Sequence, residues 1–446
     1  MTLAPAPPLS RLLDLSAQLL QAVRTGRSAT DWMAQCPPDA RAGVQALGFD
    51  ALRRLGAATE LRKLLAPKPP PPQVDALLCT ALALLWPQAQ PPYPDHTLVD
   101  QAVNAARQRT PAAAGFINAV LRRFVRDRTA LVEAAERTPL GAWNHPGWWV
   151  ERVRQDWPTH WQAVLRAANQ RPPMTLRVNV RRDTGSAYVQ RLAALGRAAT
   201  LLDDPALAGQ AVVLDQPCPV QQLPGFAEGE VSVQDAAAQR AAGLVLGSGE
   251  QALPAGARVL DACAAPGGKT AHLLERAELD LLALDSDPQR LARVAETLGR
   301  LQLKAELRAA DARQPAGWWD GRPFDAILLD APCTASGIVR RHPDIRWLRR
   351  PEDLLALARV QSELLQALWP LLRPGGRLVY ATCSVFKAEG AQQIDAFLQR
   401  LPAGAARSDP TAPGHLLPVA DNSATPSVRG AAAQQDGFFY ACLHRH

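Results

Sequence analysis

The chain has 446 residues and a net charge of +7, with 47% hydrophobic and 20% charged residues. This composition is typical of a globular protein of two or three domains and excludes a disordered or fibrous chain. Since no apolar run approaches the roughly 18 residues of a membrane span and the N-terminus lacks the features of a signal peptide, we expect a cytoplasmic protein.

The first third of the chain shows only helical patterning. Leucine and alanine recur at helical spacing over residues 8–66, and after a proline run at 67–72 further helices are expected over 76–86, 98–103 and 114–123. Residues 1–142 are therefore predicted to form an all-helical domain. Residues 1–170 hold 19 basic and 13 acidic residues, which favours RNA as a partner about as well as ordinary solvation. Arg122 and Arg123 are candidate RNA contacts, with a solvated helix end as the alternative.

Residues 143–240 are predicted to form a small α+β, RRM-like module that binds RNA. A tryptophan-rich helix begins near His145, and residues 174–180 alternate as a β-strand does. A helix over 187–195 and further short strands up to residue 235 follow. Arg177 and Asn179 share one face of the first strand and are candidate RNA contacts, although a polar, solvated face explains them nearly as well.

Residues 241–446 alternate between strand-like and helical patterns. Strands are expected over 257–263, 279–285, 305–311, 324–330 and 376–383, and helices over 267–277, 287–301, 351–372 and 387–400. This order predicts a doubly wound, Rossmann-like α/β sheet whose ligands bind at the carboxyl ends of the strands. A late strand over 437–443 is expected to be antiparallel and to lie at the edge of the sheet. No role is predicted for residues 403–435.

The first strand of this sheet is followed by a loop suited to a cofactor. Its sequence, Cys263-Ala264-Ala265-Pro266-Gly267-Gly268-Lys269, lets the backbone approach a ligand closely. Cys263 stands where a phosphate-binding Walker A loop needs glycine, and the GxGxxG pattern of dinucleotide sites is absent. Asp285 and Asp311 end the next two strands, where carboxylates can hold ribose hydroxyls and an adenine amino group. An adenosine ligand without phosphates indicates S-adenosylmethionine, although each acid alone could be a helix cap.

Two cysteines follow neighbouring strands, Cys333 after Asp330-Ala331-Pro332 and Cys383 after Thr382. Carbon 5 of cytosine becomes nucleophilic only after another group adds to carbon 6, and a thiolate is well suited to that addition. From the residues alone, either cysteine could be the nucleophile. The seven cysteines of the chain form no CxxC pair, so we expect neither a metal site nor a disulfide framework.

The sequence resembles the RsmB/NOP family of RNA cytosine-C5 methyltransferases over nearly its whole length. The resemblance rests on LVDQAV and GFINAVLRRF in the helical part, which are similar to a NusB-like domain, on residues 263–269, 330–333, 340–344 and 382–384, and on Asp-Gly-Phe-Phe at 436–439. It implies that Cys383 attacks the base and that Cys333 helps to release the product. It implies further roles for the following residues: Cys263 to Lys269, Asp285, Asp311 and Asp330 in binding the cofactor, and Asp330 and Lys269 in holding the base. Arg340 and Arg341 follow the loop of Cys333, where RNA phosphate would pass, and a structural ion pair is the alternative for them.

The resemblance implies a reaction and a partner. We expect S-adenosylmethionine-dependent methylation of carbon 5 of a cytosine in 16S rRNA, on an unassembled or partly assembled small subunit, by a monomer that needs no metal and no membrane. The sequence, read as three domains over 1–142, 143–240 and 241–446, leaves two alternatives open. One is the same chemistry on tRNA, and the other is a non-catalytic RNA-binding or ribosome-assembly protein that keeps the methyltransferase fold.

Overall fold

The computed structural model describes residues 7–88, 91–419 and 434–446. By its internal contacts the chain forms two units, Met1–Arg171 with Val339–Pro351, and Pro172–Ile338 with Glu352–His446. The chain thus leaves the second unit after Ile338 and re-enters it at Glu352. Among the described residues, no helix combines the length and the apolar character that crossing a membrane requires.

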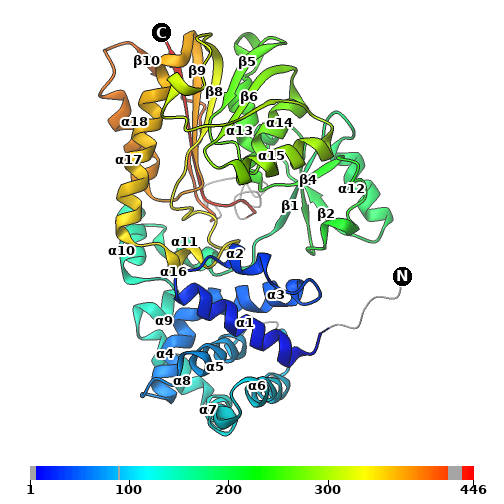
Figure 1. The fold of residues 1–446 in the computed structure, drawn as a ribbon, viewed down its shortest axis with the longest axis vertical. Coiled ribbons are helices and arrows are strands. Elements are labelled where there is room, and N and C mark those ends of the chain that lie inside the picture. The colour runs from blue at the N-terminus through cyan, green and yellow to red at the C-terminus, as the bar shows by residue number, and fades with distance from the viewer. Residues whose placement is uncertain (1–6, 89–90, 420–433) are drawn as a thin grey trace. The chain divides into compact units, whose positions relative to one another are not determined.

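Every regular element that the structure describes in the first unit is a helix (Figure 1). At its centre lies α5 (Pro72–Leu85), which is buried at every position from Ala76 onward. Pro72 suits the first turn of α5, because that turn has no partner for the N–H that proline lacks. The other helices are α1 (Leu9–Arg24), α2 (Ala29–Ala34), α3 (Arg41–Arg53), α4 (Leu55–Leu65), α6 (Asp95–Arg109), η1 (Pro111–Ala113), α7 (Ala114–Arg126), α8 (Arg128–Glu136), α9 (Pro139–Trp143), α10 (Gly147–Asp156), α11 (Trp161–Ala168) and α16 (Ile345–Leu348).

Residues 339–351, which contain α16, are part of the first unit although they stand far along the chain. The guanidinium of Arg346 is buried and donates to the backbone carbonyls of Asn144 (3.3 Å) and Ala168 (2.6 Å). Arg53 of α3 donates to the carbonyl of Arg340 at 2.6 Å. Buried arginines bonded to carbonyl oxygens fix this segment among the helices, since each lost bond would leave a buried polar group unpaired.

The second unit begins with a small four-stranded antiparallel sheet in the order β2-β3-β1-β4. The strands are β1 (Met174–Val178), β2 (Ala199–Leu201), β3 (Ala211–Leu214) and β4 (Val231–Val233), and the helices and turns between them are α12 (Gly185–Ala194), η2 (Pro205–Leu207) and η3 (Val220–Gln222). One face of β1, with Leu176 and Val178, packs into a core with α12. The predicted α+β module is confirmed.

The rest of the second unit is built on an eight-stranded sheet in the order β10-β12-β9-β8-β5-β6-β7, with β11 beside β12. Strands β5 to β9 are parallel, and helices cover both faces (Figure 1). The strands are β5 (Ala257–Asp261), β6 (Leu279–Asp285), β7 (Glu306–Ala309), β8 (Phe324–Asp330), β9 (Leu372–Thr382), β10 (Ala406–Ser408), β11 (Gly414–Leu416) and β12 (Phe438–Arg445). One face packs on α13 (Ala236–Leu246), α14 (Gly268–Arg276) and α15 (Pro288–Leu301), and the other on α17 (Pro351–Leu368) and α18 (Ala391–Leu398).

The doubly wound sheet and its five predicted parallel strands are confirmed. The late strand, β12, is antiparallel to β9 as expected. Its expected edge position is wrong, because β10 and β11 pair with its other side. Those two short strands lie within residues 403–435, for which the sequence predicted no role, and residues 420–433 of that stretch are outside the described residues.

Candidate active site

The loop between β5 and α14 presents backbone at the carboxyl end of the sheet. Gly267 has φ +97°, and a Cβ there would lie 3.0 Å from the Cα of Val294, so only glycine fits this turn without a shift. Gly268 then opens α14. The residues from Cys263 to Gly268 have small side chains, and N–H groups in the first turn of a helix have no partner within the helix, a combination that suits a ligand.

Two acids on neighbouring strands face this loop. Asp285 ends β6, is buried, and accepts hydrogen bonds from the N–H groups of Ala265 (3.2 Å) and Asp287 (3.1 Å). Asp261 ends β5, is fully buried, and accepts a hydrogen bond from the Thr270 hydroxyl at 2.6 Å. Burial raises the pKa of Asp261 to about 7. The structure therefore places one buried carboxylate on the loop and a second behind it.

Asp311 follows β7 by two residues and is partly exposed. Its carboxylate accepts several hydrogen bonds from Arg313, one of them 2.8 Å long from the guanidinium. These bonds lower the pKa of Asp311, which stays ionised at neutral pH. A ligand that used this carboxylate would share it with Arg313.

Lys269 of α14 and Asp330 at the end of β8 form an ion pair of 2.6 Å. Burial lowers the pKa of Lys269, but the adjacent Asp330 carboxylate raises it by more, so the pKa is raised overall. Cys383 also raises it. The ammonium also lies over the Phe438 ring, 5.4 Å from its centre. Lys269 and Asp330, both predicted site residues, are thus in contact, and Lys269 is close enough to Cys383 for that side chain to affect its pKa.

The two predicted cysteines meet. The Sγ atoms of Cys333 and Cys383 are 3.4 Å apart, although 50 residues separate them in the chain. Parallel pairing of β8 with β9 explains this, because it places Asp330 opposite Ala381 and so brings both loops to one edge. The hydrogen bond with Cys383 and burial raise the pKa of Cys333 well above its usual range. Cys333 therefore stays a protonated thiol beside Cys383 at neutral pH.

Sequence reasoning missed the residues that hold the two cysteine loops. Glu389 is fully buried and accepts hydrogen bonds from Thr334, which follows Cys333, and from Ser384, which follows Cys383. A single acid in the short segment after Cys383 gave no pattern that could have singled it out. Only the pairing of β8 with β9 brings its partners together.

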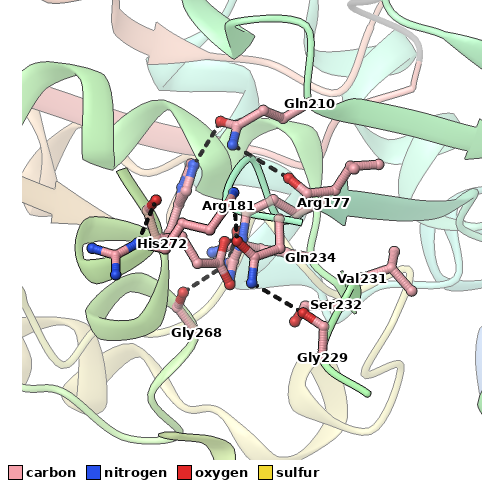
Figure 2. Close-up of polar contacts among 12 residues, drawn as sticks. Arg177, Arg181, Gln210, Gly229, Val231, Ser232, Gln234, Gly268 and His272 are labelled. Carbon is pink, nitrogen blue, oxygen red and sulfur yellow. Dashed lines mark hydrogen bonds and ion pairs between the residues drawn. The ribbon is translucent and has the colours of Figure 1, made fainter. Parts of the chain in front are cut away.

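The candidate RNA contacts of the middle module lie inside the protein. Arg177 is 1% exposed, its guanidinium bonds both carboxylate oxygens of Glu275 on α14 (2.7 and 2.8 Å), and it also donates to the carbonyl of Gly268 at 2.8 Å (Figure 2). Asn179 is also buried and donates to the carbonyl of Gly229. The polar face of β1 is covered by α14, so Arg177 supports the first turn of α14 and has no surface on which to meet phosphate.

The other candidate RNA contacts differ in exposure. Arg122 and Arg123 are exposed on α7 of the first unit. Arg340 is buried within the first unit and Arg341 is half-buried there. By their exposure, Arg122 and Arg123 are better placed than Arg340 and Arg341 to bind a polyanion.

One group of possible metal ligands occurs among the described residues, Asp409, Cys442 and His444, with ligand atoms within 4.8 Å of one another. Asp409 already bonds His444 at 3.3 Å. Cys442 pairs with Val379 of β9, several residues before Cys383. We interpret the group as an ion pair where β10 meets β12, apart from the cysteine site.

Comparison with known families matches all three parts of the chain. Residues 252–444 match the family described as 16S rRNA methyltransferase RsmB/F. Residues 145–221 match the RsmF/B-like ferredoxin-like domain, and residues 17–126 match the NusB family.

Individual relatives are similar over most or nearly all of the chain. A protein of Vibrio cholerae named ribosomal RNA small subunit methyltransferase B is 41% identical over 445 residues, which span 99% of this chain and 96% of that one. A protein of the same name from Pseudomonas putida is 46% identical over 356 residues, 78% of each chain. The solved structure of PH0851 is similar with a TM-score of 0.72 and 24% identity, covering 99% of this chain and 100% of that one, which shows a shared fold.

Proposed function

The chain belongs to the RsmB/F family of 16S rRNA methyltransferases, and we propose that it methylates carbon 5 of a cytosine in 16S rRNA with S-adenosylmethionine as the donor. The observation that carries the proposal is the pair of cysteine sulfurs 3.4 Å apart, at the carboxyl ends of β8 and β9. Methylation of an amino group or a ribose hydroxyl needs no thiol, whereas addition to carbon 6 of a pyrimidine needs a strong nucleophile.

The residues at the ends of β5 to β8 fit S-adenosylmethionine. Residues 263–268 offer small side chains and a helix N-terminus, and the glycine at 267 allows the close approach. In this proposal Asp285 holds the ribose hydroxyls, Asp311 the adenine, and Asp330 the amino-acid end. When bound, S-adenosylmethionine supplies an electrophilic methyl group on its sulfonium. Among the described residues, no donor reaches Oδ1 of Asp261, which leaves that buried carboxylate oxygen free for a polar partner.

The protein groups then act on the base in order. Cys383 gives its proton to water and adds as a thiolate to carbon 6, which makes carbon 5 an enamine carbon able to accept the methyl group. Asp330 and Lys269, paired at 2.6 Å, hold the cytosine ring at its polar edge. A base then removes the proton from carbon 5, the bond between sulfur and carbon 6 breaks, and the Cys383 thiolate leaves. Cys333, which stays protonated in the free protein, assists this release.

Delivery of the RNA is assigned to the first unit. Arg122 and Arg123 on α7 are exposed and offer charge to phosphates. The cytosine must be turned out of its stack, because attack at carbon 6 needs access to the ring face. The names of the relatives support 16S rRNA over tRNA as substrate, and we propose that a monomer acts on RNA of an unassembled or partly assembled subunit.

The roles of the cysteines are tested with Cys383→Ala and Cys333→Ala on RNA labelled in the target region. Cys383→Ala is expected neither to methylate nor to form an adduct, because the attacking sulfur is gone. Cys333→Ala is expected to attack and to accumulate a covalent RNA–protein adduct, visible as a shifted band on a denaturing gel. An adduct in Cys383→Ala and none in Cys333→Ala would reverse the two roles.

The substrate is tested by bisulfite sequencing of RNA from a strain lacking the gene. One cytosine of 16S rRNA should lose its protection and regain it on complementation with the wild-type gene but not with Cys383→Ala. Unchanged 16S rRNA together with a changed tRNA would move the reaction to tRNA. No change in any RNA would favour the non-catalytic alternative.

A further inference from the structure

Glu389 is a fully buried carboxylate that the reaction proposed above does not use. It ends the short 3-10 helix η7 (Lys387–Glu389), close behind Cys383 in the chain. Burying a charge costs free energy unless donors surround it, and the donors that the structure gives this carboxylate are neutral groups. A buried charge in such surroundings, beside two reactive sulfurs, points to a role beyond packing.

The carboxylate of Glu389 accepts four hydrogen bonds, two at each oxygen. Oε1 accepts from the N–H of Thr334 at 2.8 Å and from Nε2 of Gln361 at 3.2 Å. Oε2 accepts from the hydroxyls of Thr334 and of Ser384, the latter at 2.6 Å. Each oxygen has two lone pairs, so a proton on the carboxyl would displace one of these donors. Burial raises the pKa of Glu389, and the four hydrogen bonds act against burial.

These donors lie next to the reacting sulfurs. Thr334 follows Cys333 directly, and Ser384 follows Cys383 directly. The Glu389 carboxylate therefore bonds, in each cysteine loop, the residue that directly follows the cysteine. A side chain long enough to bond Thr334 and Ser384 at the same time can hold the two loops together.

Further bonds fix the position of Glu389 itself. Its backbone carbonyl accepts from the Tyr380 hydroxyl at 2.9 Å and the Thr382 hydroxyl at 3.2 Å, both on β9. The hydroxyls of Ser336 and Ser384 bond each other at 2.8 Å and join the two loops a second time. Bonds from β9 thus fix the backbone of Glu389, while its carboxylate bonds the loops behind both cysteines.

We propose that Glu389 is the positioning residue of the cysteine pair: its carboxylate holds the loops behind Cys333 and Cys383 so that the sulfurs face each other at 3.4 Å. The consequence for methylation rests on the proposed function. The consequence for the distance between the sulfurs does not, and it is measured without RNA or cofactor.

Two variants separate the effect of side-chain length at position 389 from the effect of its charge. Glu389→Gln keeps the length of the side chain and can bond both loops through its amide. Glu389→Asp keeps the charge but is one methylene shorter and cannot reach both loops. Positioning predicts that Glu389→Gln stays close to wild type and that Glu389→Asp is severely impaired. The opposite order would mean that charge matters and reach does not, which overturns the proposal.

The direct readout is oxidation of the purified chain with diamide, which takes two electrons and two protons from two thiols to form a disulfide. Mass spectrometry of the digested protein follows the bond between Cys333 and Cys383. We expect rapid formation in wild type, somewhat slower formation in Glu389→Gln, and much slower formation in Glu389→Asp. Asp50→Asn, which removes a buried carboxylate in the first unit, is the matched control and should oxidise at the wild-type rate.

Variants that each remove one hydroxyl keep the test decisive should a Glu389 variant fail to fold. Thr334→Val removes one hydroxyl donor on the Cys333 side, and Ser384→Ala removes the one on the Cys383 side. Each should slow disulfide formation and, because a buried hydrogen bond is lost, lower the thermal midpoint by only a few degrees, while the dissociation constant of S-adenosylmethionine stays near wild type. Wild-type oxidation rates in both folded variants would overturn the proposal.

Methylation adds a second readout. In Glu389→Asp we expect the single-turnover rate to fall by about 100-fold, as misplacement by about 1 Å does in enzymes, while KM for RNA stays near wild type. A wild-type chain that methylates no cytosine would refute the proposed function, and the diamide experiment would still decide the role of Glu389. Normal oxidation and methylation in Glu389→Asp would refute the positioning role and leave the proposed function intact.

Discussion

Asp261, at the end of β5, shows how burial can raise the pKa of a carboxyl group. It is fully buried, and the first cause of its raised pKa, about 7 against an ordinary 3.8, is the loss of solvent. The folded chain therefore binds this proton more tightly than the unfolded chain does. The resulting stability is fully present below pH 3.8 and is lost as the pH rises through about 7.

Asp261→Asn should remove this pH dependence, since the amide oxygen can still accept from Thr270 and does not titrate. Between about pH 4 and pH 7, wild type should lose stability relative to the variant by a few kcal/mol, at about 1.4 kcal/mol per pKa unit. Thermal midpoints of both proteins across that range measure the difference. Midpoints that move in parallel would contradict it.

Asp311→Asn is the control for this titration, because Arg313 lowers the pKa of Asp311. A lowered carboxyl pKa gives stability that is present above the unfolded pKa and is lost as the pH falls through the folded pKa. The control difference should therefore have the opposite sign. It should also be small, because this partly exposed pair is screened by solvent.

The candidate catalytic residues could be picked out from the sequence, but the residue that holds their loops could not. Cys333, Cys383, Lys269 and Asp330 each follow a recognisable strand, and strand ends of a parallel sheet meet at one edge. Glu389 follows no strand pattern of its own. Its four hydrogen bonds come from three separate segments that only the folded chain brings together.

At the level of elements, buried hydrogen bonds of Arg177 join β1 of the small sheet to α14, a helix that packs on the large sheet (Figure 2). The alternating pattern of β1 correctly predicted a strand with one polar face. It could not show what covers that face, because α14 lies nearly a hundred residues further along the chain. The pattern of a solvated strand and that of a strand buried against a polar helix face are the same in sequence.

The buried pair of Arg177 and Glu275 gives a test at this scale. Arg177→Met leaves the Glu275 carboxylate buried without its cation and should destabilise the second unit by about 3–5 kcal/mol. Changing both residues, with Glu275→Leu in the Arg177→Met background, should recover much of that loss because no unpaired charge remains. Urea unfolding followed by tryptophan fluorescence measures both. A double variant as unstable as the sum of the single variants would contradict the expected coupling.

The same pair should affect the proposed cofactor-binding loop over residues 263–268, because Arg177 also bonds the carbonyl of Gly268. In the double variant, which should recover much of its stability but lacks this bond, S-adenosylmethionine should bind more weakly than in wild type. Calorimetric titration measures the dissociation constant. Arg123→Met, an exposed arginine of the first unit, is the control and should bind the cofactor normally.

At the scale of the whole molecule, the fold class of each part could be predicted, because helical and strand periodicity is local. The helical first part, the small α+β module and the doubly wound sheet all follow from such periodicity. The membership of residues 339–351 in the first unit could not be predicted. That membership depends on buried bonds of Arg346 and Arg53 to distant carbonyls, and an arginine in sequence is read first as a surface residue.

Arg346 gives the test of this arrangement. Burial, and the charge of Arg53 after it, lower the pKa of Arg346 to about 9, and its guanidinium donates to carbonyls of Asn144, Ala168 and Val339. Arg346→Leu leaves these buried carbonyls without that donor, at about 1–3 kcal/mol each. Hydrogen exchange should accelerate over residues 139–171 and 339–351.

Amides of β5, β8 and β9, which belong to the second unit, should keep their wild-type exchange rates in Arg346→Leu. Arg107→Leu, at an exposed position of α6, is the matched control and should leave both regions unchanged. Acceleration confined to the second unit would contradict the placement of residues 339–351 in the first. Faster exchange over residues 339–351 in Arg346→Leu, and not in Arg107→Leu, would show that this segment, which starts a few residues after Cys333, depends for its order on the helical unit.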